Sequence, residues 1–361
     1  SYISTNAYAE FENIFGGKHY IKLLGGYNYE QQDYRATKSE RNGLLMPDVE
    51  DINFAMGETM SITSDASRWR YAGAFFRLNY SYDNRYLFEV NGRYDGSSKF
   101  PNNSQWGFFP SASAAWRLSE ERFWKVDPKF LSNVKLRMSY GALGNSNVNP
   151  YSYLEKFSLS TFSTTGTSTD GRYLDGSAKL RYTKNPSQIP DNIGWETSKT
   201  VDVGIDLGFL HNKITLSADY YVRKTIDMYT VGPTLPDTFG ASSPKGNYAD
   251  MSTYGYEISL GYNDSFKLAD RPLSFGVKVT LADYYSVIDK YNNPTRDLDD
   301  YYVGQRIGEI WGYVCNGLFQ SQDAIDTAFN GKGYKNDIMQ TSVNYITHPG
   351  DMRFEDLNGT N

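Results

Sequence analysis

Apolar and polar residues alternate along most of this chain with a period of two, which is typical of β-strands whose two faces differ. Between Arg70 and Tyr82 the even positions are mostly apolar or aromatic, whereas the odd positions include Arg77 and Asn79. The alternation resumes after the Asp83-Asn84 turn. We predict ten strands, at about 2–15, 19–30, 70–82, 85–95, 108–118, 134–140, 201–209, 213–223, 254–262 and 273–281.

The links between these strands are alternately short and long. The short ones are 16–18, 83–84, 120–132, 211–212 and 264–271. The long ones are 31–68, 98–104, 145–194, 230–246 and 288–361. One pair breaks the rule, because 120–132 is longer than 98–104. The alternation predicts an all-β antiparallel sheet with turns at one end and loops at the other, as in a transmembrane β-barrel.

Composition decides which membrane classes remain. Only 39% of the 361 residues are hydrophobic, and no stretch approaches the roughly 18 apolar residues of a membrane helix. A β-barrel is compatible with this, because its strands show one apolar face only. The 16% aromatic content argues against disorder, and many aromatics lie near strand ends, as an interfacial girdle requires. A soluble β-sandwich also alternates and stays an alternative.

Several chemistries are disfavoured. A net charge of −6 without a basic run argues against nucleic-acid binding, and the single Cys315 excludes a disulfide framework and a cysteine-built metal site. None of the three histidines has a neighbour at ligand spacing. Asp202 and Asp206 lie roughly 13 Å apart on one strand face, too far for paired acid/base catalysis. We therefore expect no enzyme and no catalytic residue.

A series of short motifs appears in order along the chain, and each alone is weak. They include Tyr71–Tyr82, Tyr86–Ser98, Trp106–Ser111, Leu136–Gly141, Trp195–Thr200, Asp219–Thr225, Ile307–Tyr313, Pro349–Asp351 and Asp356–Gly359. Together, at this spacing, the set resembles the SusC/RagA family of TonB-dependent outer-membrane transporters.

The resemblance implies active import of oligosaccharides or oligopeptides across the bacterial outer membrane. It implies a SusD-like surface lipoprotein as partner, and energy from TonB–ExbB–ExbD acting through a plug domain. Residues 1–361 would be a partial barrel domain, about ten strands of a presumed 22-strand barrel, without the plug and the barrel-closing strands. An open sheet edge cannot face lipid, so we expect this piece not to fold stably alone. The alternatives are a passive porin or adhesin-like barrel, or a soluble β-sandwich binding module.

Charged residues on the polar strand faces are candidates for the barrel interior. They either brace one another and the plug, or form a polar path for solute. They are Arg77, Glu89, Arg93, Arg117, Lys135, Arg137, Asp202, Asp206, Asp219, Arg223, Glu257 and Lys278.

Aromatic residues near the external loops are candidates for substrate binding, because rings offer apolar faces to sugars. They are Trp195, Tyr248, Tyr301, Tyr302 and Trp311.

Asp351, Asp356 and Asn358 resemble the start of a calcium loop, in which Asp and Asn oxygens converge around a glycine turn. The distal bidentate acid is missing, so a solvated Asx-rich turn is the alternative. We expect no other cofactor.

Overall fold

The computed structural model describes residues 1–46, 48–49, 51–57, 60–161, 181–183, 186, 188–190, 192–233, 238, 243–268, 270–298, 300–328 and 347–355. The chain divides into two compact units, Ser1–Ile307 and Gly308–Asn361. The first unit contains a ten-stranded antiparallel sheet, which confirms the predicted fold class. The second contains β13 (Cys315–Leu318), α1 (Gln322–Ala328) and β14 (Met352–Phe354). No helix in the described ranges is long and apolar enough to cross a membrane.

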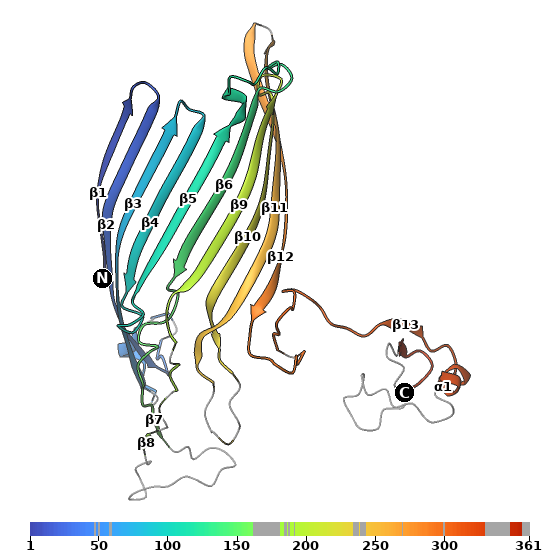
Figure 1. The fold of residues 1–361 in the computed structure, drawn as a ribbon. Helices are drawn as coiled ribbons and strands as arrows, with labels where there is room; N and C mark the ends of the chain where they lie inside the picture. The colour runs from blue at the N-terminus through green and yellow to red at the C-terminus, as the bar shows by residue number, and fades with distance from the viewer. Residues whose placement is uncertain are drawn as a thin grey trace, which may run out of the picture. The chain divides into compact units, whose positions relative to one another are not determined.

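The ten strands lie side by side in chain order, and each is antiparallel to its neighbours (Figure 1). They are β1 (Tyr2–Phe15), β2 (His19–Arg41), β3 (Met60–Tyr82), β4 (Tyr86–Ser97), β5 (Trp106–Arg117), β6 (Asn133–Asn145), β9 (Glu196–Phe209), β10 (Ile214–Val231), β11 (Lys245–Leu268) and β12 (Arg271–Lys290). Short β7 (Leu159–Thr161) and β8 (Arg181–Thr183) pair with each other between β6 and β9. Short 3-10 turns occur at Ile52–Phe54 (η1) and Leu118–Glu120 (η2).

Two hairpins are longer than predicted, so two predicted links are wrong in part. β2 and β3 stay paired out to Arg41 and Met60, well inside the predicted loop 31–68. Polar residues occupy both faces of this extension, so period-two hydrophobicity cannot reveal it, although the paired backbones satisfy each other's hydrogen bonds. Likewise β11 and β12 pair as far as Leu268 and Arg271, where a loop over 264–271 was expected.

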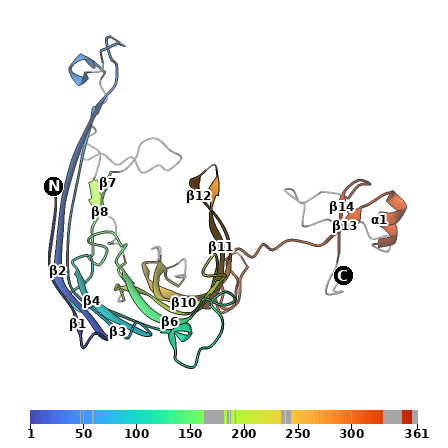
Figure 2. The same cartoon turned by 90° about the horizontal axis from the view of Figure 1, so that it is seen from above.

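The sheet is curved, with a concave and a convex face (Figure 2). The register brings apolar residues together on the convex face: Val203 lies opposite Met138 on one side and Tyr220 on the other. These three side chains are 54–58% exposed. Soluble monomers rarely expose a contiguous apolar surface of this extent. The convex face is therefore the one that faces lipid.

The sandwich alternative is wrong for the described part of the chain. Its other two sheets have two strands each, so neither could cover the ten-stranded sheet. The buried apolar cluster consists of Phe100, Val148 and Ile193, which lie in the links beyond the strand ends rather than between two sheets.

A carboxylate ties the strand ends together at the short-turn end of the sheet. Glu121 accepts hydrogen bonds from the Tyr86 hydroxyl, from Trp116 Nε1 at 3.0 Å and from Arg85 Nη1 at 3.2 Å. The rings of Tyr86 and Trp116 stack with their centroids 6.3 Å apart. The Tyr86 and Trp116 hydrogen bonds, followed by the Arg85 charge, hold the pKa of Glu121 below its usual value of 4.5.

This arrangement predicts a pH-dependent contribution to stability. Because the pKa of Glu121 is lower in the folded state, its contribution is present above pH 4.5 and is lost as the pH falls through the folded-state pKa. In the full-length receptor, Glu121→Gln should lower the unfolding temperature at pH 7, and the difference from wild type should shrink in acid. The neighbouring Glu120→Gln, which alters an exposed ion pair with Arg117, is the control and should have little effect. Equal effects of both changes at pH 7 would contradict this account.

Candidate functional site

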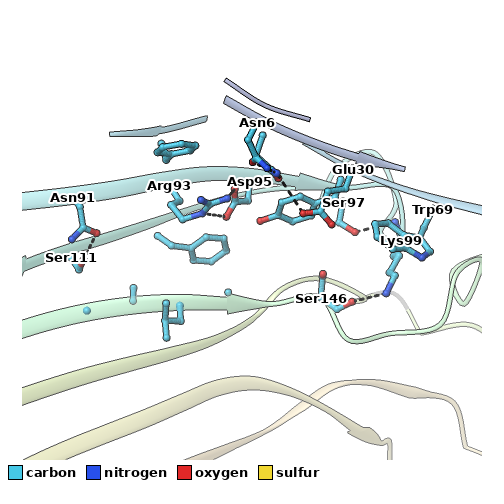
Figure 3. A pocket seen from close by; sticks show the side chains of 18 of the residues that line it. Asn6, Glu30, Trp69, Asn91, Arg93, Asp95, Ser97, Lys99, Ser111 and Ser146 are labelled. Carbon is cyan, nitrogen blue, oxygen red and sulfur yellow. Dashed lines mark hydrogen bonds and ion pairs between the residues drawn. The ribbon is translucent and has the colours of Figure 1, made fainter. Parts of the chain in front are cut away.

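A hollow of 810 Å³ lies on the concave face toward the long-loop end of the strands (Figure 3). Its lining comes from seven strands, β1 to β6 and β9, and from residues just beyond two of them. Strands β1 and β6 are not neighbours, so they can line one hollow only where the sheet curves around it. In a closed barrel this face would line the interior.

An ion pair lies against the wall of the hollow. Arg93 donates to both carboxylate oxygens of Asp95, at 3.0 and 2.9 Å. Asp95 lies opposite Gly73 in the register, and a Cβ at Gly73 would come within 2.1 Å of Asp95 Oδ1. The missing side chain thus lets the pair lie flat on the sheet, with the guanidinium carbon 5.4 Å from the centroid of the Phe75 ring. A bidentate pair of this kind is a fixed, nearly neutral wall element.

Amide and carboxylate groups form the side of the hollow nearest β1. Asn28 Nδ2 donates to Asn6 Oδ1 at 2.7 Å, and the Tyr2 hydroxyl donates to Glu30 Oε2 at 2.9 Å. Such groups can donate to or accept from the hydroxyls of a sugar or the peptide groups of a peptide.

Lys99 carries the charge that the hollow leaves available. Its ammonium lies 5.6 Å from the centroid of the Trp69 ring and donates to the Ser146 carbonyl oxygen at 3.4 Å. No carboxylate of the described residues forms an ion pair with it. Burial lowers the pKa of Lys99, which lies in the loop after β4. The cation and the indole face together form one corner suited to a polar ligand with an apolar side.

A second charged cluster spans three strands lower on the concave face. Arg137 on β6 and Asp219 on β10 both lie opposite Gly204 of β9, and they meet above it, with Arg137 Nη2 2.9 Å from Asp219 Oδ1. Arg137 also donates to Asp206 at 2.8 and 2.9 Å. Lys135 adds a fourth charge, 3.5 Å from Asp206. The cluster braces the wall.

The other predicted interior charges share the concave face or its rim but have separate partners. Arg77 pairs with Glu89 at 2.7 Å, and Arg117 pairs with Glu120 at the turn end. Glu257 lies opposite Asp219, and Asp202 lies opposite Ser139.

Arg223 lies 5.6 Å from the centroid of the Tyr221 ring. Lys278 lines a second hollow, of 550 Å³, together with Asp206. A solute path along these residues stays a prediction.

The predicted substrate-binding aromatics do not gather at one place. Trp195 packs 5.2 Å from both Phe100 and Phe109, centroid to centroid, and its indole N–H donates to the Gln105 carbonyl at 2.9 Å. This is a packing position beside the 810 Å³ hollow rather than a free loop surface.

Tyr248 belongs to β11 instead of a loop, and a Cβ at Gly246 would lie 2.8 Å from its ring. Tyr301 is 53% exposed and packs edge-on against Tyr291. Tyr302 is partly buried in the same loop. Trp311 belongs to the unit Gly308–Asn361.

Sequence reasoning missed the aromatic and basic corner of the hollow. Trp69 and Tyr71 continue the odd-numbered face of β3, but the predicted strand began at Arg70. Extending the same alternation by one residue would have found Trp69. Lys99 had no such signal, because its partners come from distant segments.

The suggested calcium loop cannot be assembled from the described residues. Asp356 and Asn358 lie outside them, and Asp351 Oδ2 accepts from the His348 backbone N–H at 2.8 Å in a turn. No group of three metal-ligating side chains occurs in the described ranges.

The Arg137 cluster leads to a test of the glycine beneath it. In the full-length receptor, Gly204→Ala should destabilise the protein by about 2 kcal/mol, since the new Cβ would lie 2.0 Å from Asp219 Oδ1 and force the pair apart. Gly141→Ala on neighbouring β6 is the matched control, because its Cβ would meet only Ser111 at 3.5 Å. Unfolding in urea measures both. Equal stability of the two variants would show that the pair does not depend on Gly204.

Comparison with solved structures shows the same fold. The RagAB peptide transporter matches 80% of this chain and 30% of its own, with a TM-score of 0.66 at 21% identity. The outer membrane transporter YddB from Escherichia coli matches 81% of this chain and 35% of its own, with a TM-score of 0.51 at 10% identity.

Curated relatives are similar along most of the chain. TonB-dependent receptor P3 of Formosa agariphila is 30% identical over 331 residues, which cover 87% of this chain and 31% of that protein. TonB-dependent receptor SusC of Bacteroides thetaiotaomicron is 29% identical over 362 residues, 97% of this chain and 34% of that protein. The chain thus spans about a third of the length of the curated relatives that it matches.

The family model described as TonB dependent receptor-like, beta-barrel matches residues 2–359. This match covers nearly the whole chain, agrees with the ten-stranded sheet and confirms the resemblance seen in the sequence. The chain belongs to the TonB-dependent receptor β-barrel family of the outer membrane.

Proposed function

We propose that this chain supplies part of the barrel wall and external loops of an active importer of oligosaccharides or oligopeptides. The observation that carries the proposal is the 810 Å³ hollow on the concave face, edged by Trp69 and Lys99. The names of two similar proteins, SusC and the RagAB peptide transporter, support nutrient import as the function. The chain performs no bond chemistry in this proposal.

The wall of the hollow has the properties that solute handling needs. The Arg93–Asp95 pair and the amides of Asn6 and Asn28 offer fixed polar contacts. Trp69 offers a flat apolar face, and Lys99 a cation that a ligand anion could approach. Several moderate contacts favour a solute that is held and then released, as transport requires.

Energy for import would come from the TonB–ExbB–ExbD complex, which acts through a plug domain. A SusD-like surface lipoprotein would deliver the ligand from outside. RagAB, whose RagA component gives the structural family its name, is a two-component peptide transporter by its title. Family membership favours this active route over a passive porin.

An uptake assay tests the proposal. In a strain lacking the receptor, plasmid-borne wild type should restore growth on one member of a panel of neutral glycans, uronate oligosaccharides and short peptides, and only when TonB is present. Trp69→Ala and Lys99→Ala should each lower uptake at limiting ligand about tenfold, because each removes roughly 1 kcal/mol of contact.

Trp106→Ala is the matched control, since Trp106 stacks on Tyr94 at 5.1 Å and alternates with the concave residues of β5. It should leave uptake unchanged at equal surface abundance. Growth restored without TonB would favour a porin. Unchanged uptake in both hollow variants would exclude this hollow from the import path.

A further inference from the structure

Two lysines face each other on the convex side of the sheet. Lys199 of β9 and Lys224 of β10 are direct partners in the antiparallel register. They alternate with the concave residues Thr200 and Arg223, so they point the same way as the apolar pair Val201 and Val222. Both lysines are exposed.

The lysine pair ends the apolar band. The adjacent row consists of Tyr140, Val201, Val222, Tyr254 and Tyr285, matched in register across five strands. From there the convex positions of β9 stay apolar for five alternate residues to Phe209, a height of roughly 20 Å after strand tilt. The next row outward is Ala142, Lys199, Lys224, Ser252 and Val287, which contains two cations and no acid.

This row lies toward the long-loop end, which faces the cell exterior in outer-membrane barrels. Lys199 follows the start of β9 at Glu196, and Lys224 precedes the end of β10 at Val231. The two ammonium groups thus lie where the apolar band gives way to the headgroups of the outer leaflet.

Nothing in the described part of the chain neutralises the pair. Like charges directly opposite each other in a sheet are destabilising, and neither lysine forms an ion pair with a described carboxylate. Two acids further along the strands are already engaged: Asp250 accepts from the Asp227 N–H, and Asp289 accepts from the Ser252 hydroxyl.

Cations at the short-turn end are arranged differently. Arg85 pairs with Asp83 and Glu121, and Lys213 pairs with Asp264 at 2.6 Å. On β3, by contrast, exposed Arg70 also points to the convex side just outward of Ala72, and no described carboxylate pairs with it. The cations without acid partners therefore lie at the outer-leaflet level on more than one strand.

We propose that Lys199 and Lys224 together bind the phosphate of a phosphorylated glycolipid headgroup in the outer leaflet. A phosphate between the two ammonium groups replaces their repulsion with two charge-assisted hydrogen bonds, while the acyl chains lie along the apolar rows beneath. The site is distinct from the solute hollow, because it lies on the opposite face of the sheet.

Lipid binding to the purified full-length receptor tests the site. The receptor is placed in phosphatidylethanolamine nanodiscs with a small fraction of lipid A, and bound lipid A is measured by native mass spectrometry. The double variant Lys199→Gln/Lys224→Gln should weaken lipid A binding about thirtyfold, as expected for two cations near an anionic surface. Dephosphorylated lipid A should bind wild type as weakly as lipid A binds the double variant.

The matched control is Lys18→Gln/Lys213→Gln, which removes two positive charges at the short-turn end and should leave lipid A binding unchanged. Inorganic phosphate at millimolar concentration should not displace bound lipid A, because it lacks the acyl contacts. Wild-type affinity in the Lys199/Lys224 variant would overturn the proposal. Equal binding of lipid A and its dephosphorylated form, or displacement by inorganic phosphate, would overturn it as well.

Discussion

The backbone's need for hydrogen-bond partners is the constraint on which the rest of this structure depends. A strand in lipid has no water to satisfy its N–H and C=O groups, so each must pair with a neighbouring strand. The ten strands meet this need by running in chain order, each antiparallel to the next. Once the register is fixed, the two-residue period sends every side chain to one face or the other.

The two faces then follow different rules. On the convex face, Met138, Val203 and Tyr220 are more than half exposed, which is stable only against lipid. On the concave face, charges are satisfied by one another, and glycine provides the room. Gly73 and Gly204 each lie under an Arg–Asp contact, so the ion pairs press against the backbone instead of filling the interior.

The sequence predicts the faces better than it predicts the sites. Alternation from Val201 to Phe209 was enough to assign β9, because a strand between lipid and water has to separate apolar from polar residues. The same rule fails for residues 31–41, where both faces of β2 are polar, so the long β2–β3 hairpin was read as a loop. Tertiary packing also hid the environment of Trp195, which an aromatic residue in a loop-like segment cannot reveal.

The hollow could not be predicted for a related reason. Asn6, Trp69 and Lys99 are far apart in the sequence, and only the curvature and stagger of the sheet bring them to one place. The lysine pair on the convex face is different, since it depends only on the register between β9 and β10. Features that need one strand pair are thus close to readable from sequence, whereas features that need five strands are not.

The central claim is that alternate residues of each strand face lipid and the barrel interior. Single cysteines at positions 257, 258, 259 and 260 of β11, in a receptor with Cys315→Ser, can carry a fluorophore that nitroxide-labelled lipids quench. The account predicts strong quenching at Ile258 and Leu260, which lie on the convex face, and little at Glu257 and Ser259. Equal quenching at all four positions, or the reverse pattern, would contradict it.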